Sequence, residues 1–303
     1  MNAVSRPFAA NQNVPADDPA AGIKPFLIKA LRDQIARLGR TGPGAQGHRG
    51  PLRPVTLGAP ALDRHLPGGG LPRAALHELA GEGADREQGA AAAGFAALWL
   101  ARLQAAGPVL WIARAASLGA IDLHAHGLAQ QGLDPKRLIL VAAKRDDEAL
   151  WAMEEGLKAK SLGAVLGEIE KLDLTASRRL QLAAEASGVT AFVLRRWRVM
   201  ERATRDALQP IAAVTRWKIE SLPSDGEDDI RWQVALARCR GGRPGTWIMA
   251  KGIMERMDGS DELHAESQWA ESQWAESERA APLSGDLAPV LGNRPLAAGA
   301  RRR

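Results

Sequence analysis

Short apolar runs alternate with longer stretches of helical periodicity between residues 51 and 252. Two of the longer stretches, 90–105 and 149–160, carry apolar residues at helical spacing. This alternation predicts βαβ units and therefore an α/β fold with a mostly parallel sheet covered by helices. The runs with the length and composition of buried strands are 75–80, 109–113, 138–142, 164–169 and 189–194.

The last part of this region has little helix between its strand candidates. Three apolar runs, at 211–220, 230–239 and 246–251, follow one another closely. A GlyGlyArgProGly sequence at 241–245 has the composition of a tight turn between the last two. We therefore expect antiparallel strands that close one edge of the sheet.

The segments that flank this core differ from it in composition. Residues 1–50 are expected to form an N-terminal tail with an amphipathic helix at 25–38 and a Gly-rich linker, and residues 253–303 a disordered tail, first acidic and then rich in Ala and Pro. The core domain is thus expected at 51–252. The apolar face of the helix either packs on its own domain or docks a partner, and consists of Phe26, Leu27, Leu31, Ile35 and Leu38.

The charges are unevenly distributed along the chain. Its formal net charge is +5. The stretch from Arg195 to Lys218 contains seven basic and two acidic residues, whereas the stretch from Glu255 to Arg279 contains eight acidic residues and two arginines. The basic stretch predicts an anionic partner. A single cysteine, Cys239, fits a reducing cytoplasm, and no stretch has the pattern of an export signal or a membrane span. We expect a cytoplasmic protein.

A Gly-bearing loop follows the first expected strand and precedes a helix. In phosphate-binding proteins such a turn directs backbone N–H groups at an anion, and the motif GxxxxGK[ST] adds a Lys for the phosphates and a hydroxyl for Mg²⁺. Neither side chain is present here, and Glu82, Asp85 and Glu87 place three carboxylates in the loop. The remaining candidates in this degenerate loop are Gly81, Gly83, Arg86, Gly89, Ala90 and Ala91.

This loop predicts that the chain does not turn over ATP and needs no cofactor. Carboxylates near a helix N-terminus favour the helix dipole themselves, so the protein would fill its own anion site. The alternative is a nucleotide held by the backbone and Arg86. No metal site is expected either, because His124 and His126 lie two residues apart in an expected helix and point in different directions.

Several long segments resemble known proteins. The lead-in LeuGlyAlaProAlaLeuAsp (57–63) with GlyGlyGlyLeuPro (68–72) resembles the segment before the phosphate loop of RecA and KaiC-like proteins. Over residues 23–252 the chain is similar to the ImuA family, RecA-like damage-inducible mutagenesis proteins of bacteria. The segments that carry this similarity are the same lead-in (57–63 with 68–72) and residues 187–196, 212–224 and 231–247.

The resemblance implies a RecA-like core whose catalytic positions are mostly lost. Arg114 and Ala115 stand where recombinases carry the water-activating Glu, and Arg196 stands where they carry the Gln that senses the γ-phosphate. Glu168 matches the metal-side acid of the Walker B position and is the one acid retained. The expected protein is therefore not an enzyme.

The same resemblance implies a function and partners. It points to an adaptor in SOS-induced translesion DNA synthesis and damage-induced mutagenesis, in the cytoplasm and associated with the nucleoid. The implied partners are an ImuB-like inactive relative of Y-family polymerases and an error-prone replicative polymerase, with RecA and single-stranded DNA as further candidates. The alternatives are a DNA-binding modulator of the recombinase filament and a weak DNA-dependent ATPase.

A basic stretch at 194–206 lies where the second DNA-binding loop of that family would emerge. Arginines there would contact phosphates, and the Trp would stack on an unpaired base. The alternative is a helix with a solvated or partner-binding basic face. The candidate residues are Arg195, Arg196, Trp197, Arg198, Arg202 and Arg205.

Overall fold

The computed structural model describes residues 52–115 except Ala84, residues 123–197, 209–224 and 230–250, and the backbone of 253–256. Predictions for the amphipathic helix at 25–38, for Arg198, Arg202 and Arg205, and for the tail beyond 256 lie outside the described residues. None of the described helices is both long enough and apolar enough to span a membrane.

The described strands form one nine-stranded sheet with the order β3-β2-β4-β5-β1-β6-β7-β8-β9. The strands from β3 to β6 in this order pair in parallel, and β6 to β9 pair antiparallel. The strands are β1 (Leu76–Gly81), β2 (Val109–Arg114), β3 (Leu138–Ala143), β4 (Ala164–Ile169), β5 (Thr190–Arg195), β6 (Thr215–Leu222), β7 (Arg231–Cys239), β8 (Gly245–Ala250) and β9 (Ile253–Arg256).

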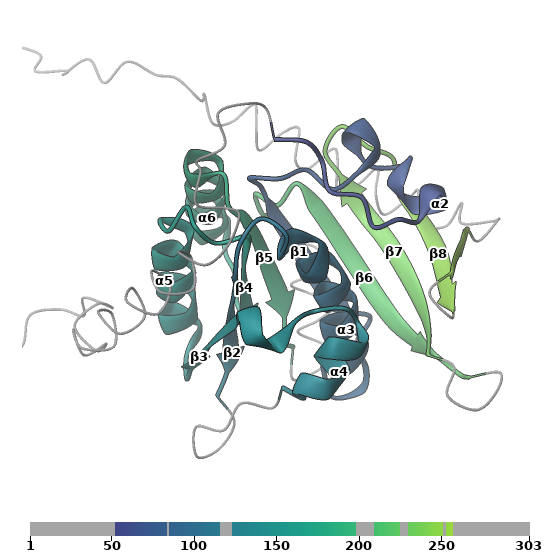
Figure 1. Cartoon of the computed structure of the whole chain (residues 1–303), viewed down its shortest axis with the longest axis horizontal. Helices are drawn as coiled ribbons and strands as arrows, with labels where there is room; N and C mark the ends of the chain where they lie inside the picture. Colours follow the sequence, from purple (N-terminus) through teal and green to yellow (C-terminus); the bar gives the residue numbers. More distant parts are fainter. Residues whose placement is uncertain are drawn as a thin grey trace, which may run out of the picture.

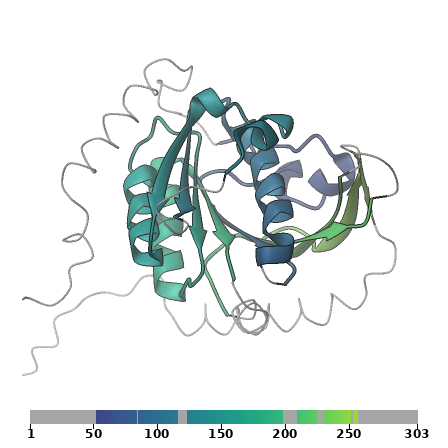
Figure 2. The same ribbon diagram turned by 90° about the horizontal axis from the view of Figure 1, so that it is seen from below.

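Helices cover both faces of the parallel part of the sheet, and Figure 2 shows two of them on one side and the long α3 on the other. In Figure 1 the short α2 lies at the end of the molecule where the antiparallel strands are. The helices are α2 (Pro60–Asp63), η3 (Pro67–Gly69), α3 (Asp85–Leu103), α4 (Ala125–Gln130), η5 (Pro135–Arg137), α5 (Asp146–Leu157) and α6 (Leu174–Ser187).

Two apolar cores hold these layers together. One lies between the sheet and α3 and contains the buried rings of Phe95, Trp99 and Trp217. The other lies between the sheet and the pair α5 and α6, around Met153 and Leu180. Strands of a parallel sheet are buried on both faces, which explains why β4 and β5 are buried at every position.

The predicted α/β class, with a mostly parallel sheet and antiparallel edge strands, is confirmed. Trp217 and Trp232 are buried core residues. Helix α3 begins five residues earlier than the predicted range, because Asp85 and Glu87 favour the first turn of a helix. The prediction that regular structure ends at Gly252 was wrong, because β9 continues the sheet by pairing with β8.

Candidate functional site

The degenerate phosphate loop singled out in the sequence joins β1 to α3 at the carboxyl ends of the parallel strands. Two of its backbone N–H groups are used within the protein. The amide of Glu82 donates to Ile219 O at 2.8 Å, and the amide of Asp85 donates to Trp197 O at 2.8 Å. In a phosphate-binding loop these two N–H groups would face an anion. Here both donate to backbone carbonyls of other segments of the same protein.

A guanidinium from β5's end lies in this loop. Arg196 donates through one nitrogen to Asp85 Oδ1 at 2.8 Å and to the carbonyl of Gly89 at 3.1 Å. A methyl group on Gly89 would clash with Asp85 Oδ1 and would meet the same Arg196 nitrogen at 2.7 Å. The loop therefore closes around an internal cation, and glycine at position 89 makes room for it.

The other nitrogen of this guanidinium binds the Walker B-like acid. Arg196 donates to Glu168 Oε1 at 2.7 Å, and Trp111 Nε1 donates to the same oxygen at 3.1 Å. The second carboxylate oxygen accepts the backbone N–H of Arg114 at 2.9 Å. Glu168 is 6% exposed and holds three donors of the protein, so its oxygens are committed to internal contacts.

The electrostatic balance of this Arg196–Glu168–Asp85 cluster favours the charged forms. Burial by itself disfavours the charged guanidinium, but the attraction of Glu168 and Asp85 outweighs it and raises the pKa of Arg196 above its usual value. The loop residue Arg86 is exposed, whereas Arg196 pairs with Asp85 at 2.8 Å and Lys218 pairs with Glu82 at 3.3 Å. Sequence spacing gives no sign of these partners because they come from distant strands.

Arg114 and Ala115, at the position expected for a water-activating acid, make structural contacts. Arg114 pairs with Glu170 at 3.0 Å, and the amide of Ala115 donates to Ala143 O at 2.8 Å. Neither residue supplies a carboxylate that would activate water.

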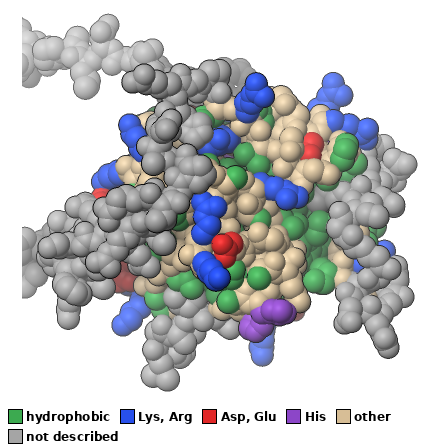
Figure 3. All heavy atoms as spheres, viewed as in Figure 1, with side chains coloured by type: hydrophobic (Ala, Val, Ile, Leu, Met, Phe, Trp, Pro, Cys, Tyr) green, Lys and Arg blue, Asp and Glu red, His purple; other side chains and the backbone are tan. Residues whose placement is uncertain are grey.

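Of the predicted DNA-contacting residues, the structure describes Arg195, Arg196 and Trp197, and none of these three is exposed. Arg195 and Trp197 are 3% and 4% exposed, and the guanidinium carbon of Arg195 lies 5.0 Å from the centre of the Trp197 ring. The expectation that Trp197 stacks on a base is corrected for this conformation, because its ring is buried. On the part of the face in Figure 3 not covered by grey atoms, Lys and Arg stand apart rather than in a stripe.

Sequence reasoning missed a buried acid beneath these residues. Glu78, in the central strand β1, is 1% exposed and ion-paired with Arg216 and, at 3.8 Å, with Arg195. The only sequence signal is an acid inside an apolar strand, which gains its meaning once β5 and β6 are seen to flank β1.

A groove of about 960 Å³ is lined by the Arg196–Glu168–Asp85 cluster and by residues of α3. Its floor includes small residues of that helix and the Trp232 ring, which a methyl group on Gly94 would meet at 2.6 Å. His124 caps the first turn of α4, His126 contacts Gln130, and the two imidazole rings lie 6.3 Å apart in an edge-to-face arrangement. Among the described residues no group of three potential ligands is placed to hold a metal ion.

A scan of protein-family models finds no match to the chain. Among solved structures, it is similar to a KaiC-like protein from Pyrococcus horikoshii, with 16% identity over 68% of this chain and 100% of that chain and a TM-score of 0.43. It is also similar to the RadB recombinase, with 16% identity over 67% of this chain and 100% of that chain and a TM-score of 0.46.

Two curated relatives are much closer in sequence. They are Protein ImuA from two strains of Caulobacter vibrioides, NA1000 / CB15N and CB 15. Each is 41% identical over 213 residues, which span 67% of this chain and 85% of the relative. At this identity and coverage, the chain belongs to the ImuA family.

Proposed function

We propose that the chain is a non-catalytic adaptor in SOS-induced translesion DNA synthesis. Its membership of the ImuA family supports a role in damage-induced mutagenesis. The observation that carries the non-catalytic part of the proposal is the guanidinium of Arg196, which is bound by Asp85, Gly89 and Glu168 where a nucleotide would need free donors.

A triphosphate would have to displace contacts that are already made. Its charge would compete with two carboxylates for Arg196, and removing that guanidinium leaves Glu168, 6% exposed, without its cation. Breaking a buried ion pair in this way costs about 3–5 kcal/mol. No Lys or hydroxyl of the motif is present in the loop to offset that cost. The same side chains that closed the site thus disfavour its reopening by ATP.

The partners in this proposal are an ImuB-like inactive relative of Y-family polymerases and an error-prone replicative polymerase, with RecA and single-stranded DNA as further candidates. The site of action is the cytoplasm, at the nucleoid. A fold that keeps its core while its loop is internally neutralised can still present surfaces to other proteins. The adaptor therefore acts by bringing the polymerases together rather than by hydrolysing a nucleotide.

Co-purification from DNA-damaged cells tests the adaptor role. The wild-type chain is expected to retain the polymerase-like partner, and Leu31→Glu with Ile35→Glu to lose it. The matched control, Lys29→Gln with Arg32→Gln, changes the net charge equally on the polar side of the same expected helix. Retention by both variants would remove the helix from the proposal, and no partner with the wild type would remove the adaptor role.

Calorimetry tests the non-catalytic part independently. Titrating the chain with ATP and Mg²⁺, with and without single-stranded DNA, is expected to give no binding heat and no phosphate release. Micromolar binding together with DNA-stimulated hydrolysis would establish the ATPase alternative instead.

A further inference from the structure

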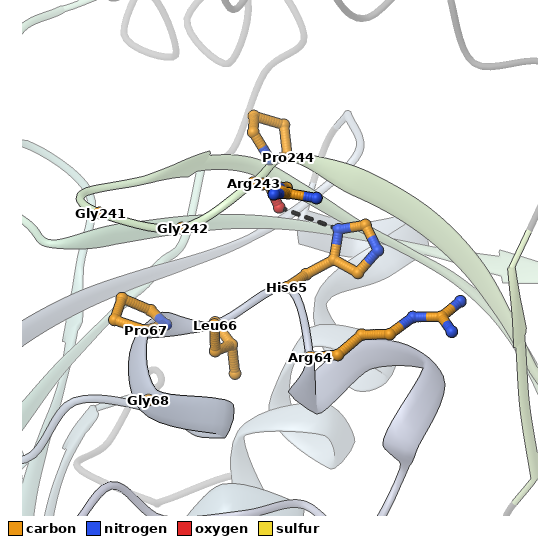
Figure 4. Close-up of a pocket in the computed structure, with 9 residues that line it drawn as sticks. All are labelled: Arg64, His65, Leu66, Pro67, Gly68, Gly241, Gly242, Arg243 and Pro244. Atoms are coloured by element: carbon orange, nitrogen blue, oxygen red, sulfur yellow. Dashed lines mark hydrogen bonds between the residues drawn. The ribbon is translucent and has the colours of Figure 1, made fainter.

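A second cavity lies away from the loop, between α2 and the turn that joins β7 to β8. It has a volume of about 860 Å³ and is lined by residues 64–68 and 241–244. Figure 4 shows these two segments facing each other. The lining contains no Asp or Glu, and Arg64 and Arg243 contribute exposed guanidinium groups. Within the described residues neither guanidinium makes an ion pair, so no described carboxylate offsets their positive charge.

Hydrogen bonds between the two lining segments fix the backbone of this pocket. Arg243 donates its N–H to His65 O at 2.8 Å, and the buried His65 ring contacts Arg243 O through Nδ1 at 3.2 Å, the dashed line in Figure 4. A methyl group on Gly242 would meet His65 O at 2.5 Å, so the close approach of the two segments needs glycine there. The Trp247 ring packs edge-on against His65 at 5.1 Å.

The chain leaves the described fold beside this pocket. The last described residue, Arg256 of β9, pairs with Trp247, whose ring packs against the pocket residue His65. The sequence that follows carries seven carboxylates between positions 258 and 278 and no Lys or Arg before Arg279. An acidic segment is thus tethered next to a basic, carboxylate-free pocket.

We propose that the acidic segment 258–278 binds in this pocket of its own chain and covers Arg64 and Arg243. The tether allows it, because an extended chain spans about 3.3–3.6 Å per residue and the first carboxylates follow Arg256 within a few residues. Each exposed ion pair between the segment and the pocket is weak. A short flexible tether compensates for this, because it holds the acidic segment at an effective concentration of about millimolar next to the pocket.

The consequence is a competition for the pocket. An anionic partner reaches Arg64 and Arg243 when the acidic segment is displaced, and rising salt weakens the internal contact. This inference concerns a surface that the adaptor proposal does not use, and it stands or falls separately from it.

Arginine modification of the full-length chain tests the proposal. The rate at which phenylglyoxal modifies Arg64 and Arg243 is compared between the wild type and a variant with Asn or Gln at all seven carboxylates. Both rates are expected to rise about threefold or more in the variant, as expected for loss of a tethered ligand. Arg145, which is exposed on the N-terminal side of α5, is the internal control and should not change.

A reciprocal measurement follows the acidic segment itself. Cleavage within 258–278 by a glutamate-specific protease is expected to be faster in Arg64→Gln with Arg243→Gln than in the wild type. The matched control, Lys136→Gln with Lys144→Gln, removes two exposed charges elsewhere and should leave the rate unchanged. Equal rates in all three chains would overturn the proposal. It would also be overturned if the two arginines were protected only after single-stranded DNA was added.

Discussion

The guanidinium of Arg196 and the carboxylate of Glu168 are joined at 2.7 Å, at the carboxyl ends of the neighbouring strands β5 and β4. In a phosphate-binding fold these are positions from which side chains would reach a nucleotide and its metal. Here they reach each other, with Asp85 completing the cluster at 2.8 Å from Arg196.

Replacing Arg196 with Met removes the cation and leaves two carboxylates facing each other. We expect the free energy of unfolding to fall by about 3 kcal/mol, because Glu168 remains buried without its partner. Urea unfolding measures this, with Arg196→Lys as the control that keeps the charge and loses the bidentate geometry. A loss below about 1 kcal/mol would show that the cluster contributes little to stability.

Combining Arg196→Met with Glu168→Gln and Asp85→Asn gives a mutant cycle. It compares the effect of Arg196→Met on the free energy of unfolding with and without the two carboxylates. When the carboxylates are neutral as well, Arg196→Met is expected to cost less than in the wild type, because no buried charge is left unpaired. The same urea titrations measure it, and equal costs in both backgrounds would contradict the coupling.

Gly89→Ala is expected to destabilise the protein although alanine is the better helix former. The added methyl would meet Asp85 Oδ1 and the Arg196 guanidinium, and overpacking of this kind costs about 1–3 kcal/mol. Gly127→Ala in α4 is the matched control. Its methyl meets only His124 Nδ1 at 3.8 Å, so the variant should be neutral or more stable by up to about 1 kcal/mol. Thermal unfolding of both variants distinguishes these outcomes.

Acid should weaken the fold through His77. This ring donates from Nε2 to Pro72 O at 2.9 Å and contacts the Thr215 hydroxyl through Nδ1 at 2.8 Å, and burial lowers its pKa from 6.5 to about 4. As the pH falls, the unfolded chain therefore binds this proton first. The free energy of unfolding should decrease between pH 6.5 and about 4, by up to about 3 kcal/mol.

The measurement is urea unfolding across that pH window. His77→Gln should reduce the slope of stability against pH, whereas His126→Gln, at an exposed position, should leave it unchanged. The assignment to His77 is refuted when its variant keeps the wild-type slope.

Cys239 should be unreactive in the folded chain. Its thiol is buried, and burial raises its pKa to about 11, so little thiolate is present at pH 8. Iodoacetamide labelling is expected to be slow in buffer and fast in urea. Fast labelling of the folded protein would contradict the buried position.

Much of the fold could be predicted from local pattern. The strand ranges were predicted to within a few residues for β1 to β5, β7 and β8, because each of these strands coincides with a short apolar run of the sequence. Strand β9 was missed because its four residues carry no alternation that differs from the tail, and pairing with β8 defines it. The N-terminal helix, Arg198, Arg202 and Arg205 stay predictions.

The sequence by itself determined the alternating α/β architecture and the loss of the Lys and hydroxyl from the loop, because these depend on residue types and their spacing. The tertiary structure decided what fills that loop. Arg196 lies 111 positions from Asp85 and 28 from Glu168, and the three meet because β5 lies between β1 and β4 in the sheet. The tertiary structure likewise showed that Arg195 and Trp197 are buried. Burial depends on which strands and side chains surround a residue in space rather than on its immediate neighbours in sequence.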